Sequence, residues 1–139
     1  MSQNPIPQGN YRPAVRFGSL VFTAGMTPRK NGVLLQSGKV TPDQPPEAFR
    51  EAARQAACNA LTAAQNCLEE GESILQILSL TVYVNASPDY TTHAKIGDLV
   101  SDYLLEQLGQ AGIGPRAAIG VATLPGNAPL EVQLTAAVG

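Results

Sequence analysis

Charged side chains are scarce in this sequence of 139 residues. Asp, Glu, Lys and Arg together make up 14% of it, and the formal net charge is −2. Soluble proteins usually carry ~25% charged residues. Because the chain also has no basic run, nucleic acid is not expected as its main partner. The lightly charged surface instead indicates that part of it is covered by another subunit.

Long apolar runs are also missing. No stretch approaches the ~20 apolar residues that a membrane-spanning helix needs. The first residues, MSQNPIPQGNYRP, are polar and rich in proline, unlike a secretory signal peptide. We therefore expect a cytoplasmic protein with one domain spanning residues 1–139, which is a common length for a single domain.

Residues with redox or metal chemistry are few. Cys58 and Cys67 lie nine positions apart in an expected helix, so their side chains point to opposite sides and cannot form a disulfide with each other. We interpret them as small apolar residues in a reducing compartment. The single histidine, His93, has no Cys, Asp or Glu at metal-ligand spacing. We expect it on the surface of a helix and not in a metal site.

Helical periodicity predicts two helices. Residues 47–70 follow Pro45 and Pro46 and end before Gly71, as helices often do. The apolar stripe of this helix is mostly alanine, so it can lie close to a sheet. Residues 87–108 form the second expected helix. Its first residues should be Ser87 as N-cap and Pro88 at the first helical position.

The remaining apolar segments predict strands. The most β-prone, residues 74–84, is apolar on both faces, which is typical of a strand in the middle of a sheet. The other expected strands are 11–17, 19–23, 33–35, 117–124 and 130–138. This order predicts an α+β domain with two helices packed on one face of a mixed sheet. The other face would then be bare unless association buries it.

The segment 114–138 carries two unexpected charges. Arg116 begins one apolar strand, and Glu131 lies near the start of the next. Arginine can bind a planar carboxylate through two parallel hydrogen bonds. One interpretation is an ordinary salt bridge for Arg116 and a solvated carboxylate for Glu131. The other is an anion-binding arginine and a glutamate that handles a water or a proton.

The short connection at 125–129 predicts that its two flanking strands pair as an antiparallel hairpin. Leu124 would then lie across from about Leu130, with Glu131 near the turn and Arg116 near the open end. The seven residues between them would separate the two charges by roughly 20–25 Å. A pocket that uses both residues would therefore combine two subunits.

Several motifs in order resemble the RidA (YjgF) family, the reactive intermediate deaminases. The run GSLVFTAG at 18–25 is similar to the family's glycine-ended strand, and AARQAACNAL at 52–61 is similar to its central helix. The pair Pro115-Arg116 and the run VATLP at 121–125 match the family's R-x-x-x-x-V-x-x-L-P signature. Glu131 lies six residues past that proline, where the family has a glutamate.

The resemblance implies a chorismate-mutase-like α+β fold and a homotrimer with its sheets inward and three pockets between subunits. It implies hydrolysis of 2-imino or 2-enamino acids, such as 2-aminoacrylate, to 2-keto acids and ammonia. Arg116 would hold the substrate carboxylate, and backbone amides near Gly25 and Ala118 would hold further oxygens. Glu131 would position the attacking water, and Tyr11 would line the pocket. No metal or organic cofactor is implied.

Four positions depart from the commoner family pattern. Ala24 stands in place of serine, Met26 in place of glutamine, Ala118 in place of cysteine, and Gln133 in place of a second acidic residue. These changes alter the pocket walls, so a specialised subfamily is expected and the natural substrate stays open. It could be a pathway-specific enamine, or another amide-like bond such as that of an aminoacrylate carbamate.

A trimeric binding or regulatory protein that holds a small carboxylate without turnover is the alternative. The pair of Arg116 and Glu131 favours an enzyme, because binding alone does not require a glutamate to position water.

Overall fold

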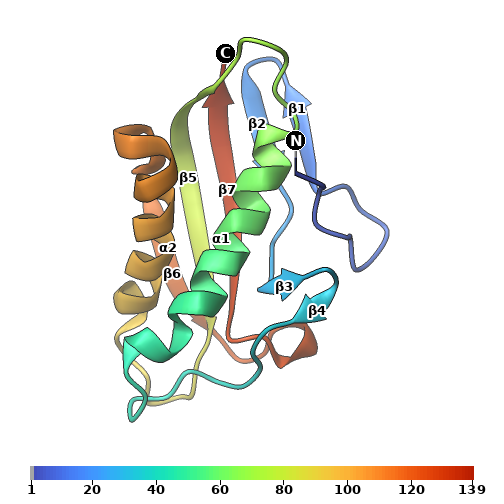
Figure 1. Cartoon of the computed structure of the whole chain (residues 1–139). Helices are drawn as coiled ribbons and strands as arrows, with labels where there is room; N and C mark the ends of the chain where they lie inside the picture. The colour runs from blue at the N-terminus through green and yellow to red at the C-terminus, as the bar shows by residue number, and fades with distance from the viewer. Residues whose placement is uncertain (1) are drawn as a thin grey trace.

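The computed structural model describes residues 2–139 as a five-stranded mixed sheet with two helices on one face (Figure 1). The strands lie in the order β1-β2-β7-β5-β6; β5 and β6 are parallel and the other neighbours are antiparallel. The predicted α+β layer is confirmed. The elements are β1 (Ala14–Phe17), β2 (Leu20–Thr23), β3 (Arg29–Lys30), β4 (Val33–Leu34), η1 (Pro46–Phe49), α1 (Arg50–Gln65), β5 (Ile74–Asn85), α2 (His93–Leu108), η2 (Gly109–Gly112), β6 (Arg116–Val121), η3 (Pro125–Asn127) and β7 (Leu130–Val138).

The core lies between the helices and the sheet. Alternate residues of β7 are buried toward the helices, beginning with Leu130, Val132 and Leu134. The alanine stripe of α1 is buried against them, which allows the helix to approach the strands closely. Both patterns follow the predicted periodicities, and β7 has the bounds predicted for the last strand.

Both helices are shorter than predicted. The first opens as the 3₁₀ turn η1, and α1 ends at Gln65 rather than at residue 70. The second begins at His93, six residues later than predicted, because the Ser87 hydroxyl donates a hydrogen bond to the Asp89 carboxylate at 2.6 Å and caps no helix. A turn closed by the Tyr90 amide and the Ser87 carbonyl occupies this segment instead.

The predicted hairpin between the last two strands is wrong. β6 pairs in parallel with β5 at the edge of the sheet, whereas β7 lies between β5 and β2. The cause is the β5–α2–β6 crossover, since a strand that follows a crossover helix packs parallel to the strand before it. The chain then passes beyond β5 to reach β7 on its other side.

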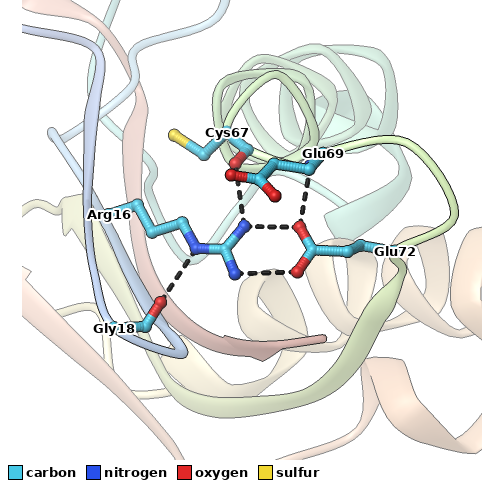
Figure 2. Close-up of polar contacts among 5 residues, drawn as sticks. All are labelled: Arg16, Gly18, Cys67, Glu69 and Glu72. Atoms are coloured by element: carbon cyan, nitrogen blue, oxygen red, sulfur yellow. Dashed lines mark hydrogen bonds and ion pairs between the residues drawn. The ribbon is translucent and has the colours of Figure 1, made fainter.

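An arginine–glutamate pair joins the β1–β2 hairpin to the loop after α1 (Figure 2). Arg16 donates to both carboxylate oxygens of Glu72, at 2.5 and 2.8 Å, and to the carbonyls of Gly18 and Cys67. Glu72 also accepts the amide of Glu69. These bonds and the Arg16 guanidinium lower the pKa of the Glu72 carboxyl to about 2.

The sheet face opposite the helices carries exposed apolar side chains. β5 lies between β7 and β6, inside the sheet as predicted, and its Leu75 and Leu78 are exposed on this face. Five further large apolar residues on or beside this face are exposed: Val15, Phe17, Leu20, Phe22 and Ile119. None of the helices formed by residues 2–139 has the length and apolarity that crossing a membrane requires.

Candidate functional site

Arg116 begins β6 and directs its side chain onto α2. Nη1 donates to Asp98 Oδ1 at 2.9 Å and to Ser101 Oγ at 3.0 Å, and Nη2 donates to the Ala94 carbonyl at 3.4 Å. The guanidinium lies against Gly97, where a Cβ would be only 2.9 Å from Cζ. The absence of a side chain at this buried glycine therefore lets the arginine rest on the helix backbone.

This anchoring leaves part of the guanidinium free. Arginine has five N–H donors in a planar fork. Three are engaged with α2, and within residues 2–139 Nε and the remaining Nη2 hydrogen have no partner. Nε and Nη2 form one edge of the fork, which is the geometry that binds a carboxylate through two parallel bonds. Asp98 and Ser101 thus hold Arg116 without occupying the edge that an anion needs.

The backbone of Ala118 faces the free edge of the sheet. The carbonyls of Pro115 and Val121 accept hydrogen bonds from the amides of Leu80 in β5 and of Ala86 just after it. Because alternate residues of an edge strand point to its neighbour, the odd-numbered residues of β6 face β5 and the Ala118 amide points away from it. An outward amide two residues from Arg116 can donate to a second oxygen of a bound anion.

Glu131, in β7, lies on the open face of the sheet. Its carboxylate is half-buried, and within residues 2–139 it has no hydrogen-bond or ion-pair partner. Burial raises the pKa of the Glu131 carboxyl above its ordinary value of 4.5. The carboxylate fits against Gly25, where a Cβ would lie 2.3 Å from Oε2. An unpaired, half-buried carboxylate costs stability and is typical of functional sites.

Gly25 offers a free amide beside this carboxylate. Its neighbours are tied to the sheet, since the Ala24 amide donates to Pro13 and Met26 exchanges two hydrogen bonds with Val132. The Gly25 amide makes no hydrogen bond among residues 2–139. The loop is therefore held firmly at the flanking residues, and its central N–H is available to a ligand.

Tyr11 and Gly25 line a cavity of about 480 Å³ between the N-terminal segment, the β3–β4 hairpin and α1. The Tyr11 hydroxyl accepts the Gln8 amide at 2.9 Å. Arg116, Ala118 and Glu131 do not line this cavity. The five predicted site residues thus form two groups, one beside β2 and β7 and the other on β6.

The two groups stay apart within one chain. Arg116 pairs with Leu80 of β5, and Glu131 pairs with Tyr83. Three residues along β5 and two strand spacings across it separate their Cα atoms by roughly 14 Å, less than the hairpin predicted. Their side chains, however, lie on opposite faces of the sheet. One chain does not bring Arg116 and Glu131 to a common small ligand.

Other residues near the site were missed or misplaced by the sequence pattern. Asp98 and Ser101 lie about one turn apart on α2 and carry no sequence motif. His93 is half-buried rather than on the open surface. Gln133 accepts a hydrogen bond from the Tyr83 hydroxyl at 3.0 Å. Among residues 2–139, no three His, Cys, Asp or Glu side chains are grouped as metal ligands would be.

Comparison with known proteins identifies the family. The model of the family described as Endoribonuclease L-PSP matches residues 1–138. The chain belongs to this family, known also as RidA/YjgF. The resemblance carried by the sequence motifs is thereby confirmed over the whole domain.

Relatives of the RidA/YjgF family with solved structures share the fold along nearly the whole chain. A "putative endoribonuclease" from Shewanella oneidensis is 32% identical, with a TM-score of 0.86 and coverage of 98% of this chain and 90% of that one. Protein Atu1372 from Agrobacterium tumefaciens, of unknown function, is 26% identical, with a TM-score of 0.84 and coverage of 96% and 86%. A further relative is similar in sequence. Protein TCP17 of Trypanosoma cruzi is 28% identical over 128 residues, which are 91% of this chain and 80% of that protein.

Proposed function

We propose that this protein is an enamine/imine deaminase. It hydrolyses reactive 2-imino or 2-enamino acids, such as 2-aminoacrylate, to 2-keto acids and ammonia. The reaction takes place in pockets between the subunits of a homotrimer and uses no metal or organic cofactor. Membership of the RidA/YjgF family supports this function, and the arrangement of Arg116 and Glu131 supports the chemistry.

The unpaired Glu131 carboxylate is the observation that carries the proposal. It is half-buried beside Gly25, and its pKa is raised by burial. A raised pKa makes a carboxylate a better proton acceptor near neutral pH. Structural ion pairs of this chain, such as Arg16 with Glu72, show the opposite shift for the carboxylate. Glu131 therefore has the properties of a group that orients and deprotonates water.

The reaction needs positioning more than strong activation. The free Nε–Nη2 edge of Arg116 binds the substrate carboxylate, and the outward amides of Gly25 and Ala118 donate to further oxygens. Water held by Glu131 adds to the carbon of the C=N bond. One proton of the water passes to the carboxylate, which returns it to the nitrogen. The resulting carbinolamine breaks its C–N bond and releases ammonia and the keto acid. Fixing an electrophilic imine beside an oriented water supplies most of the rate increase.

Subunit association brings the two groups of residues together. Arg116 and Ala118 lie on β6, which has an unpaired outer edge, and Glu131 and Gly25 lie on the open sheet face. That face carries exposed apolar side chains, which commonly mark an interface. In a cyclic trimer the edge of one subunit can meet the open face of the next, so each pocket takes its arginine and its glutamate from different subunits.

Two other functions are tested alongside deamination. The Shewanella relative and the family description carry the word endoribonuclease, but the net charge of −2 does not favour RNA as a partner. A trimeric protein that binds a carboxylate without turnover is the second alternative. A protein that only binds would have no use for the half-buried, unpaired Glu131 carboxylate, whose burial costs stability.

A coupled assay tests the proposal directly. An amino-acid oxidase or a dehydratase generates different imines, and release of the keto acid is followed with and without this protein. Acceleration that is lost in Arg116→Ala supports the proposal. No acceleration with any imine refutes it, and tight binding of keto acids without turnover then identifies a binding protein. Cleavage of a labelled RNA by wild type, lost in Glu131→Gln, would identify a ribonuclease.

Mixing two inactive variants tests the shared pocket. Arg116→Ala and Glu131→Gln subunits are unfolded together in equal amounts and refolded. If each site takes one residue from each of two neighbours, about a quarter of the sites regain both residues. Sites built within one chain would regain none. Each variant refolded alone is the control.

A further inference from the structure

The face of α2 that borders β6 presents a third polar side chain besides Asp98 and Ser101. His93, Gly97 and Ser101 follow one another at intervals of four residues, so they lie on one side of the helix. On β6, the residues that point toward α2 are Arg116 and the alternate positions 118 and 120. The helix and the edge strand therefore face each other along these two rows.

Two glycines let the rows approach closely, one from each element. Gly97 of the helix leaves room for Arg116, and Gly120 of the strand leaves room for His93. A Cβ on Gly120 would lie 2.6 Å from His93 Nε2. The imidazole thus rests on the backbone of β6 in the same manner as the guanidinium rests on the backbone of α2.

The imidazole is fixed in place, but its nitrogens are free. Tyr90, a buried residue, packs edge-on against the ring, with centroids 5.2 Å apart and an angle of 74° between planes. The Tyr90 hydroxyl is itself held by the Thr92 carbonyl at 2.9 Å. Neither ring nitrogen of His93 has a hydrogen-bond partner within residues 2–139. A half-buried polar ring that is oriented but unpaired can accept a ligand contact.

The position of His93 relates it to Arg116. His93 is one helical turn from Gly97, on which the guanidinium lies, which is a distance of about 6 Å along the helix. On the strand, Ala118 lies midway between Arg116 and Gly120, about 7 Å from each. The imidazole and the guanidinium therefore lie on the same side of β6, one before and one after Ala118 along the strand. A small molecule held by Arg116 and the Ala118 amide can therefore extend toward His93.

We propose that His93 is a third side chain of the substrate site, which contacts the nitrogen end of an imino acid whose carboxylate is held by Arg116. This inference rests on the proposed function and adds the group that handles the departing amine. Histidine is the side chain best suited to donate and accept protons near neutral pH.

Cleavage of the C–N bond of the carbinolamine requires only His93 and water. The protonated imidazole gives its proton to the amine nitrogen of the carbinolamine. The electron pair of the C–N bond leaves with ammonia, while the hydroxyl proton of the carbinolamine passes to water and the C=O bond forms. The neutral imidazole then regains a proton from solvent. Water supplies the oxygen of the keto acid, and no oxidant or reductant is required.

The single histidine makes this inference testable by nuclear magnetic resonance. Untagged full-length protein shows only one set of imidazole resonances, which can be followed during a titration with pyruvate. We expect pyruvate to shift them in wild type and not in Arg116→Ala. Resonances that stay in place while calorimetry shows saturating pyruvate bound would overturn the inference, whatever the outcome of the deaminase assay.

Kinetics test the proton transfer. We expect His93→Gln and His93→Ala to lower kcat about 100-fold, at the low end of the range for general acids, with little change in KM. Added imidazole should restore part of the activity of His93→Ala, which a merely structural role for His93 does not explain. Lys95→Ala, an exposed change on the same helix, is the matched control and should leave kcat unchanged.

A second variant moves the ring without removing it. Gly120→Ala places a methyl group 2.6 Å from the present position of Nε2, and the histidine side chain can swing aside without disrupting the fold. We expect it to lower kcat as His93→Gln does, and added imidazole to help it less than His93→Ala because the native ring still blocks the space. If wild type turns over an imine and His93→Gln does so at the same rate, the inference about His93 is refuted, whereas the proposed deaminase function stands. If wild type neither binds pyruvate nor turns over an imine, both proposals fail.

Discussion

A single methyl group at Gly97 should separate the activity of this protein from its stability. Gly97 is buried within α2, and a Cβ there would lie 2.9 Å from Cζ, 3.0 Å from Nε and 3.2 Å from Nη2 of Arg116. The distance to Cζ is shorter than real Cβ contacts and the other two are tight, so Gly97→Ala must shift the guanidinium away from the helix. The flexible arginine side chain can move, and the backbone of α2 can stay where it is.

The two consequences have different magnitudes. Alanine is favoured over glycine inside a helix by about 0.8–1.0 kcal/mol. The displaced ion pair includes Asp98, whose side chain is 65% exposed. Exposed ion pairs contribute about 0–1 kcal/mol, so the free energy of unfolding should change by less than about 1 kcal/mol. One misplaced hydrogen bond to a charged substrate costs about 1.5–3 kcal/mol, which lowers kcat/KM roughly 10- to 150-fold.

A double-mutant cycle isolates the cause. Keto-acid release and thermal unfolding are measured for wild type, Gly97→Ala, Arg116→Ala and the double variant. If Gly97 acts through the guanidinium, adding Gly97→Ala to Arg116→Ala should not lower kcat/KM further. Full activity in Gly97→Ala, or losses that add in the double variant, would refute the proposed role of the guanidinium position.

Three further changes should have distinct signatures. Glu131→Gln should raise the free energy of unfolding at pH 7, because the folded-state pKa of Glu131 lies above its ordinary 4.5 and ionisation destabilises the fold. Urea titrations should show that this gain in stability vanishes below about pH 4.5. A loss of stability at pH 7 would contradict burial of an unpaired carboxylate. The same variant should lower kcat more than ligand affinity, whereas the reverse favours a binding protein. Gly25→Ala puts a methyl group 2.3 Å from the present position of Glu131 Oε2. Keto-acid release should therefore fall, with little loss of secondary structure by circular dichroism. Full activity would show that the observed position of the carboxylate is not needed for the reaction. Glu72→Gln should lower stability to urea at pH 7. This difference in stability from wild type should fade as pH falls from 4.5 toward 2, where wild-type Glu72 itself is protonated. A stability difference that is unchanged at acid pH would exclude the Arg16 ion pair as its source.

Local patterns in the sequence predicted the layers of the fold well. Alternation through Leu130, Val132 and Leu134 defined β7 to the residue, because a strand with one face in the core cannot shift by one position. The alanine stripe of α1 was equally clear. The start of α2 was not, since Ser87 makes a local hydrogen bond to Asp89 that competes with helix capping.

The pairing of β6 could not be read from loop length. A short connection between two strands favours a hairpin, but here the same strand also follows a crossover helix. Pairing of β6 with β5 and its contacts with α2 outweighed the short loop. The error placed Arg116 and Glu131 along one hairpin, whereas they occupy opposite faces of one sheet. The expectation that one chain cannot hold both on a small ligand survives for this different reason.

The candidate site shows a recurring arrangement that residue types alone do not reveal. Arg116, Glu131 and His93 each rest against a glycine of a neighbouring segment, at Gly97, Gly25 and Gly120 respectively. At none of these glycines is φ positive, so the backbone conformation does not require glycine there. The requirement comes from the polar side chain opposite, which needs backbone contact to lie where it does. Specificity in this chain can therefore change by gain of a methyl group on a neighbouring segment, even when every polar residue of the site is retained.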